Sequence, residues 1–230
     1  MDCNYKEIEV SFVEEIVNII RITQTDDGNQ RVPLLRGEGR SIYQPTAGIF
    51  REHINQEMEE GIFWEFLRNI PSHSNIDIRN PWLVLSLAQH HGVPTRLLDW
   101  TISPLVATFF AVSSEHKDDS AVWAVWGLGN DEDKLPPDPF KIDTIHQMTP
   151  VTISPRITVQ SSRFTVHPNN KRVLEYLSDG DRCLKITIPS NKKMAILQRL
   201  DFMGINRHTL FPDLDGLGQW LSWRARQNTV

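Results

Sequence analysis

The sequence has few cysteines and no long apolar run, and both absences narrow the class of protein. Cys3 and Cys183 are the only two cysteines in 230 residues, too few for a disulfide framework and without the spacing of a metal or redox motif. No apolar stretch approaches the roughly 20 residues of a membrane span. No basic-then-apolar leader follows Met1. We therefore expect a cytoplasmic protein with no membrane partner and no bound metal.

The signatures of several enzyme classes are also missing. Gly37-Glu38-Gly39 lacks the third glycine and the following helix of a dinucleotide-binding fold. No serine or cysteine nucleophile signature occurs, and no His-x-x-x-His spacing places two imidazoles on one helix face. The chain has no internal repeat and no low-complexity tract.

What the chain does have is an ordinary globular composition, with 40% hydrophobic and 23% charged residues. Its net charge of −5 argues against indiscriminate binding to nucleic acid or anionic lipid. The charge is uneven, since residues 1–30 hold seven acids and two cations, whereas residues 151–210 hold ten cations and four acids. This cationic segment could bind phosphate groups or could be a solvated surface, and the sequence leaves both open.

Helix signals dominate the first half of the chain. Ser11 and Glu14 have the spacing of a capping box, which predicts a helix that ends near Arg21. Apolar residues then recur every four positions through residues 46–69, which predicts an amphipathic helix that Gly61 could divide.

Two further helices have clear boundaries. Asn80 before Pro81 predicts a helix over residues 81–91. Its last residues, His90 and His91, point about 100° apart. Their side chains could bind a ligand, or they could pack in the core or cap the C-terminus of the helix. Ser103-Pro104 predicts the start of a nearly all-apolar helix over residues 104–112. Residues 94–101 are therefore expected to form a loop between two core helices.

Strand signals dominate the second half, and the whole predicts a single α+β domain with mixed central sheets flanked by helices. The stretch 130–155 carries five prolines and is expected to be an irregular functional or mobile segment. Strands are predicted at residues 31–37, 121–126, 157–160, 164–167 and 183–188, and closing helices at about 191–203 and 214–227.

One short segment concentrates polar chemistry beside apolar helices. Residues 89–101 read Gln-His-His-Gly-Val-Pro-Thr-Arg-Leu-Leu-Asp-Trp-Thr. A buried donor or acceptor without a partner costs about 1–3 kcal/mol, so these groups must bond to one another or to a ligand. The segment is therefore the first candidate site. In the structural alternative, Arg96 and Asp99 form a buried ion pair, Thr95 caps a turn and Trp100 anchors the core.

Two acids near the C-terminus offer a weaker candidate. Asp213 and Asp215 could be paired metal ligands. They also stand where a helix begins, and acids there complement the helix dipole by about 0.3–1 kcal/mol each. We favour the structural role.

The chain resembles the FRG domain family, named after a Phe-Arg-Gly motif. The resemblance is carried by Leu35-Arg36-Gly37, by residues 89–101 and by the apolar helix behind them, and it extends from about residue 31 to about 222. Leu35 stands where phenylalanine or tyrosine is usual, and Ser162 replaces a common glycine. The resemblance divides the chain into an N-terminal helical segment, residues 1–30, and an FRG domain that looks like an ADP-ribosyltransferase, residues 31–230.

The order of these motifs is similar to that of ADP-ribosyltransferases, and this second resemblance implies a set of site residues. An arginine-glycine pair ends the first strand, a small-hydroxyl motif precedes an Ala- and Phe-rich helix, and a glutamine replaces the usual late glutamate. By this resemblance the catalytic residues are Gln160, Arg36, His90 and Asp99, and the residues that bind NAD are Arg36, Gly37, Tyr43, Thr95, Arg96 and Thr101.

The chemistry implied is transfer of ADP-ribose from NAD to a macromolecule. Cleavage of the nicotinamide–ribose bond passes through a cationic, oxocarbenium-like state, so positioning and electrostatics supply most of the catalysis. A fork donor such as Arg36 would hold phosphate oxygens, and Tyr43 would stack on nicotinamide. Gln160 lacks the charge of the usual glutamate, and it could suffice if the acceptor is itself reactive or is activated by another group such as His90 or Asp99.

The resemblance leads us to expect a bacterial toxin or antiviral defence effector with RNA or protein as the acceptor and an antitoxin protein as a partner. A non-catalytic module that binds a nucleotide or a partner is the alternative from another class. Metal-dependent hydrolysis by Asp99, Asp213 and Asp215 is least favoured, because no dense ligand spacing supports it.

Overall fold

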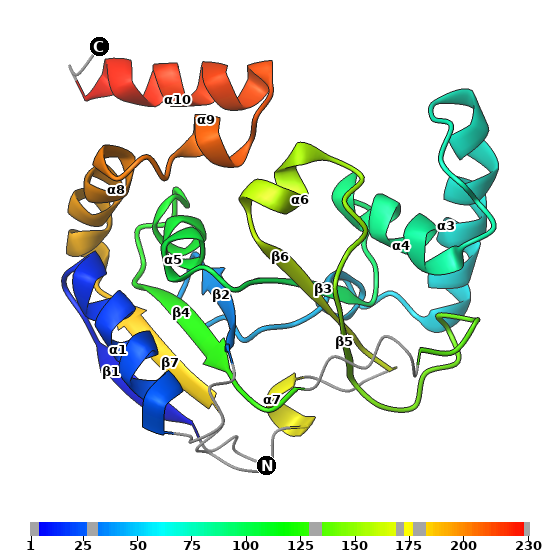
Figure 1. Ribbon diagram of the computed structural model, residues 1–230, viewed down its shortest axis with the longest axis horizontal. Coiled ribbons are helices and arrows are strands. Elements are labelled where there is room, and N and C mark those ends of the chain that lie inside the picture. The colour runs from blue at the N-terminus through cyan, green and yellow to red at the C-terminus, as the bar shows by residue number, and fades with distance from the viewer. Residues whose placement is uncertain (1–4, 27–31, 129–134, 169–172, 177–182, 228–230) are drawn as a thin grey trace.

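The computed structural model describes residues 5–26, 32–128, 135–168, 173–176 and 183–227 (Figure 1). Cys3 and most of the predicted turn at residues 25–30 lie outside this part of the chain. The strands are β1 (Lys6–Glu9), β2 (Leu34–Glu38), β3 (Leu97–Thr101), β4 (Ser120–Val125), β5 (His146–Met148), β6 (Ser162–Val166) and β7 (Cys183–Ile188). The helices are α1 (Val13–Asp26), α2 (Gly48–Arg51), α3 (Gln56–Asn69), α4 (Pro81–His90), α5 (Pro104–Val112), α6 (Pro155–Val159), α7 (Val173–Tyr176), α8 (Lys193–Phe202), α9 (Arg207–Leu210) and α10 (Leu214–Arg226), with 3-10 turns at η1 (Ile70–Ser72) and η4 (Ser190–Lys192).

The strands form one seven-stranded sheet in the order β1-β7-β4-β2-β3-β6-β5. Only β1 and β7 run parallel, and the other neighbouring pairs are antiparallel. The predicted α+β class with a mixed sheet and flanking helices is therefore confirmed. In the described residues, no helix is both long enough and apolar enough to cross a membrane.

Helices cover both faces of the central strands, which explains why β4 is buried throughout. Val122 and Ala124 face a core built with α1, α5 and α8. Ala121 and Trp123 face the opposite core, because successive side chains of a strand point to opposite faces. A third core joins α3 and α4 to β3, β5 and β6.

The sheet splits at its centre, between β2 and β3. Leu35 opposite Thr101 is the one residue pair that joins these strands, whereas β2 and β4 are joined along five residues each. Figure 1 shows β4, β7 and β1 on one side of this split and β6 and β5 on the other, with α6 above it. The split leaves backbone and side chains of β2 and β3 facing a hollow.

The helix caps predicted from sequence are confirmed at two helices. The Asn80 side chain accepts from the backbone N–H of Trp82 and Leu83 at the start of α4. Ser103 accepts from Val106 N at the start of α5. Such capping satisfies backbone donors that have no partner within the helix.

Two predicted helices have different boundaries. α1 extends to Asp26 instead of ending near Arg21, and Glu15, not Glu14, accepts from Ser11 N at 2.8 Å. The predicted helix over residues 46–69 is broken into α2 and α3. The break lies at residues 52–55, where His53 adopts a φ of 55°, whereas Gly61 lies inside α3.

Two further assignments from sequence are wrong. Residues 97–101 form β3 rather than a loop, because they pair with β6 along their whole length. Residues 157–160 do not form a strand: α6 begins at Pro155 after Ser154, and Gln160 is its C-cap. β-branched residues suggested a strand there, but the Ser-Pro start and tertiary packing favour a helical turn. Sequence patterns also failed to predict β1, β5, α7 and α9. β5 lies within residues 130–155, which were predicted to be irregular, and it pairs there with β6.

Candidate functional site

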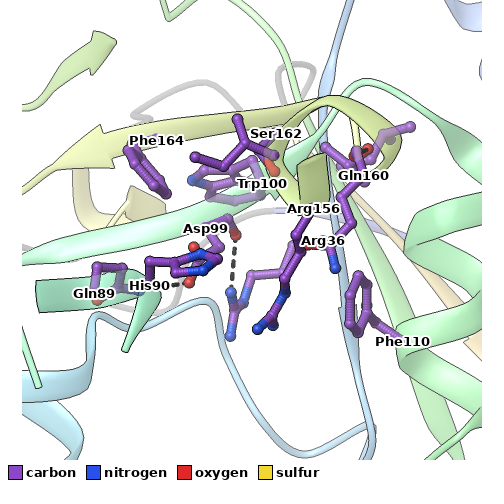
Figure 2. A pocket seen from close by; sticks show the side chains of 14 residues that line it. Arg36, Gln89, His90, Asp99, Trp100, Phe110, Arg156, Gln160, Ser162 and Phe164 are labelled. Carbon is purple, nitrogen blue, oxygen red and sulfur yellow. Dashed lines mark hydrogen bonds between the residues drawn. The ribbon is translucent and has the colours of Figure 1, made fainter. Parts of the chain in front are cut away.

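A cavity of about 290 Å³ opens at the split between β2 and β3 (Figure 2). Its volume is close to the lower end of the range for small-molecule sites. β2 and β3 form two walls, the C-terminal turn of α4 a third, and α6 and β6 cover it. The lining residues are Leu35, Arg36, Gly37, Gln89, His90, Asp99, Trp100, Thr101, Phe110, Arg156, Ile157, Gln160, Ser162 and Phe164.

Arg36 stands on β2 and bridges the split. Its Nη1 donates to the backbone carbonyl of Asp99 at 2.8 Å, and its Nε donates to Glu38 Oε1 at 2.6 Å. Glu38 is itself buried. These two bonds hold the guanidinium on the cavity wall with N–H donors left over, which is the arrangement that a bidentate anion site requires.

Asp99 supplies the carboxylate of the cavity, and a relay of hydrogen bonds orients it. Leu97 N donates to Thr95 Oγ1 at 3.1 Å, so the Thr95 hydroxyl proton is directed to Gln89 Oε1 at 2.7 Å. Gln89 Nε2 then donates to Asp99 Oδ2 at 2.5 Å. Thr95 is buried behind the cavity and does not line it. Its role is therefore to fix the Gln89 amide and, through it, the carboxylate.

Arg156, from α6, brings a second guanidinium to the cavity. It stacks over the Phe211 ring, 4.4 Å from the ring centroid, and no described carboxylate or carbonyl is bonded to it. Burial lowers the pKa of Arg156 from its ordinary value, and the Asp99 carboxylate opposes that shift. A ligand anion would offset this desolvation.

His90 lies in the last turn of α4, between Gln89 and His91. Burial, followed by the positive charge of Arg156 and the neighbouring His91, lowers the pKa of His90, although Asp99 acts in the opposite direction. At neutral pH the imidazole is therefore uncharged. An uncharged imidazole can accept a proton.

Gln160 reaches the cavity from the end of α6. Its Nε2 donates to the Leu210 carbonyl at 2.9 Å, and its backbone carbonyl accepts from Thr101 Oγ1 at 2.7 Å. The amide is thus oriented by a backbone group. A carboxylate at this position would face the Leu210 carbonyl instead of donating to it.

Gly37 lines the cavity and has a packing reason to be glycine. A Cβ built on it would lie 2.0 Å from the Ala107 carbonyl oxygen and 2.5 Å from Ala111 N. The backbone of α5 therefore touches β2 directly at the cavity wall, which no other residue would permit without displacement of the helix.

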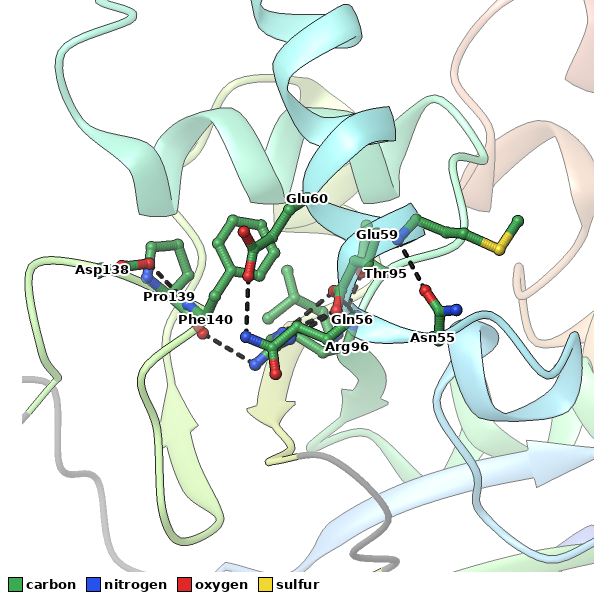
Figure 3. Close-up of polar contacts among 11 residues, drawn as sticks. Asn55, Gln56, Glu59, Glu60, Thr95, Arg96, Asp138, Pro139 and Phe140 are labelled. Atoms are coloured by element: carbon green, nitrogen blue, oxygen red, sulfur yellow. Dashed lines mark hydrogen bonds and ion pairs between the residues drawn. The ribbon is translucent and has the colours of Figure 1, made fainter.

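Three of the predicted NAD-binding residues do not line this cavity. Tyr43 is exposed elsewhere, with Arg40 stacked 5.2 Å from its ring centroid. Thr95 lies behind the wall, as described above. Arg96 is wholly buried and is paired with Glu59 at 2.6 Å (Figure 3).

The partners of Arg96 account for its burial. Its Nε lies 3.1 Å from both carboxylate oxygens of Glu59, and its Nη1 donates to the Pro139 carbonyl at 3.2 Å. The guanidinium lies 4.8 Å from the Phe140 ring centroid. Arg96 therefore ties α3 to the segment before β5, and its partner is Glu59 rather than the Asp99 of the structural alternative.

The remaining predicted residues are brought together. Arg36, Gly37, His90, Asp99, Thr101 and Gln160 all line the cavity. No ligand-binding role was predicted from the sequence for Gln89, Trp100, Phe110, Phe164 or Arg156 as individual residues, although all five line the cavity. A signal for Arg156 existed, because it follows a Ser-Pro helix start of the kind used to place α5.

Asp213 is the N-cap of α10, as the structural interpretation predicted. Its side chain accepts from Gly216 N at 2.7 Å at the start of α10. Across the described ranges, no group of three or more His, Cys, Asp or Glu side chains could hold a metal ion.

Comparison with known proteins identifies one family. Residues 33–120 match the FRG domain, as the central motif led us to expect, but the match ends well before residue 222, to which the resemblance was expected to extend. The matched segment contains β2, β3 and the C-terminal turn of α4, and so three of the walls described above. No curated protein and no solved structure matches the chain.

Proposed function

Because residues 33–120 of this chain match the FRG domain, and because the chain builds a charged cavity at a split in the sheet, we propose that the protein is an NAD-dependent ADP-ribosyltransferase. The acceptor is a macromolecule, RNA or protein. The proposal includes the likeness of the fold to that of ADP-ribosyltransferases and a role as a toxin or antiviral defence effector.

One observation carries the proposal: two guanidinium groups and one carboxylate, from β2, α6 and β3, meet in a single cavity. The pyrophosphate of NAD needs bidentate hydrogen-bond donors, which the guanidinium groups of Arg36 and Arg156 supply. The ribose needs negative charge when it becomes cationic in the transition state. A cavity of about 290 Å³ has room for the nicotinamide–ribose end, with the rest of the dinucleotide over the rim.

The Asp99 carboxylate supplies the negative charge that Gln160, an uncharged amide, cannot provide. It is the one acid among the described residues that line the cavity, and the Gln89 amide fixes one of its oxygens. The other oxygen is directed toward the cationic face of the ribose in this proposal. Gln160 then hydrogen-bonds a ribose hydroxyl, and Phe110, Trp100 and Phe164 provide apolar walls for the nicotinamide ring.

The test is transfer of label from NAD. Purified protein is incubated with labelled NAD and a cell extract, nicotinamide release is measured, and samples are digested in parallel with protease and ribonuclease. We expect release of nicotinamide and macromolecular label, both lost in Asp99→Asn. Asp215→Asn, an acid at the exposed start of α10, is the matched control and should retain both. Intact NAD with no label, but measurable binding of the nucleotide, would favour the non-catalytic module instead.

A further inference from the structure

A second hollow of about 630 Å³ lies behind the C-terminal turn of α4. The end of α3, the η1 turn and the segment that leads into α6 form its other walls. Its lining residues are Phe66, Asn69, Ile70, His73, Ser74, Ile76, Leu87, His90, His91, Ile153 and Ser154. We refer to it as the α3–α4 pocket.

His90 belongs to both hollows. It lines the cavity at the sheet split and also the α3–α4 pocket, so the last turn of α4 is the partition between them. The two residues next to His90 lie on opposite sides of this partition, since Gln89 lines the cavity and His91 lines the α3–α4 pocket. The rings of His90 and His91 meet edge to face with centroids 5.1 Å apart.

The walls of the α3–α4 pocket select against a charged occupant. Among the described residues that line it, none is an aspartate, glutamate, lysine or arginine. An arginine or lysine acceptor would lose its hydration there without gaining a counter-ion, which is strongly unfavourable. Phe66, Ile70, Leu87 and Ile153 instead offer broad apolar contact.

Polar groups border this apolar wall. Asn69, His73 and Ser74 lie at or near the pocket surface on the α3 side. A flat ring with polar edges uses both kinds of wall, since its face contacts the apolar side chains and its edges reach amide, imidazole and hydroxyl groups. A nucleobase is such a group, and only a base that has left a helical stack can enter a hollow in the protein surface.

We propose that the α3–α4 pocket binds a nucleobase of a single-stranded nucleic acid as the acceptor, with His90 between that base and the ribose in the cavity. The inference rests on the proposed function. It narrows the acceptor from any macromolecule to an uncharged heterocycle presented by an unpaired strand.

The transfer balances with the groups at hand. The bond between ribose C1′ and the nicotinamide nitrogen breaks, and its electron pair neutralises the pyridinium ring, which leaves as nicotinamide. A lone pair on an amino or ring nitrogen of the base forms the new bond to C1′. The proton on that nitrogen passes to the uncharged His90 and then to solvent. No oxidant, reductant or metal is required.

The test fills the pocket without touching the cavity. Ser74→Trp places an indole in the α3–α4 pocket, and Ser72→Trp, on the exposed side of the same turn, is the matched control. The probes are labelled NAD with single-stranded RNA or single-stranded DNA oligonucleotides of mixed sequence, an arginine-rich protein, and a fluorescent oligonucleotide for binding in the absence of NAD. Circular dichroism checks that both variants are folded.

We expect Ser74→Trp to lower oligonucleotide labelling at least tenfold and to weaken oligonucleotide binding, while nicotinamide release and the KM for NAD stay within twofold. Ser72→Trp should match the wild type, and comparison of the RNA and DNA arms identifies the source of the base. Label confined to protein, unchanged oligonucleotide binding in Ser74→Trp, or a raised KM for NAD would each overturn the inference. If the wild type releases no nicotinamide, the proposed function fails. The effect of Ser74→Trp on oligonucleotide binding without NAD then tests the pocket independently.

Discussion

The buried ion pair between Arg96 and Glu59 gives the sharpest prediction about stability. The side chains are only 1% and 2% exposed, and Arg96 adds a bond to the Pro139 carbonyl and a contact with Phe140. Removal of one partner from such a pair costs about 3–5 kcal/mol, because the other charge stays buried without compensation. We therefore expect Arg96→Met to lower the free energy of unfolding by about 3–5 kcal/mol.

The same loss of unfolding free energy should also lower the melting temperature, Tm. For a chain of this length, 1 kcal/mol shifts Tm by about 2–4 °C, so Arg96→Met should melt roughly 6–20 °C lower. Glu59→Gln keeps an acceptor for Arg96 N, to which Glu59 Oε1 is bonded at 3.0 Å. The double variant Arg96→Met/Glu59→Gln should therefore be more stable than Arg96→Met, because no lone buried charge remains.

Urea unfolding followed by tryptophan fluorescence measures these differences, with unchanged m values as evidence that the unfolded states are comparable. Arg79→Met is the control, since that side chain is 86% exposed, and it should change stability by no more than about 0.5 kcal/mol. If Arg96→Met unfolds within 1 kcal/mol of the wild type yet loses binding of NAD, Arg96 belongs to a ligand site and the structural assignment is refuted.

The other predictions concern the cavity. Thr95→Val should lower the turnover of NAD at least tenfold with a smaller effect on KM, because the Gln89 amide is free to rotate away from Asp99; an unchanged turnover would contradict the relay. Gly37→Ala should destabilise the fold by more than 2 kcal/mol, by the general cost of overpacking, since its Cβ meets the backbone of α5; a Tm equal to that of the wild type would contradict the close approach. The rate of transfer should rise with pH at acidic pH and stay constant through neutrality, because His90 must be uncharged to accept a proton and its pKa is lowered from the ordinary value. His90→Gln should abolish this rise. A rise that persists in the variant would show that another group titrates.

Much of the site could be predicted from the sequence because local rules place its parts. Asn80-Pro81 and Ser103-Pro104 fix the starts of α4 and α5, and the apolar stretch at residues 121–126 predicts the buried strand β4 to within one residue at each end. The same rules failed where two of them competed. At residues 157–160 the β-branched residues alone led to the predicted strand, whereas Ser154-Pro155 before them begins a helical turn in the structure.

The sequence by itself determined the family motif, the helix starts, the α+β class and the concentration of polar groups at residues 89–101. Only the tertiary structure decided which of those groups line the cavity. Arg96 and Asp99 are three residues apart, yet one is buried against α3 and the other lies on the cavity wall. The partners that separate them, Glu59 and Gln89, lie in other elements. Side-chain direction and long-range pairing are properties of the packed chain, and no local pattern encodes them.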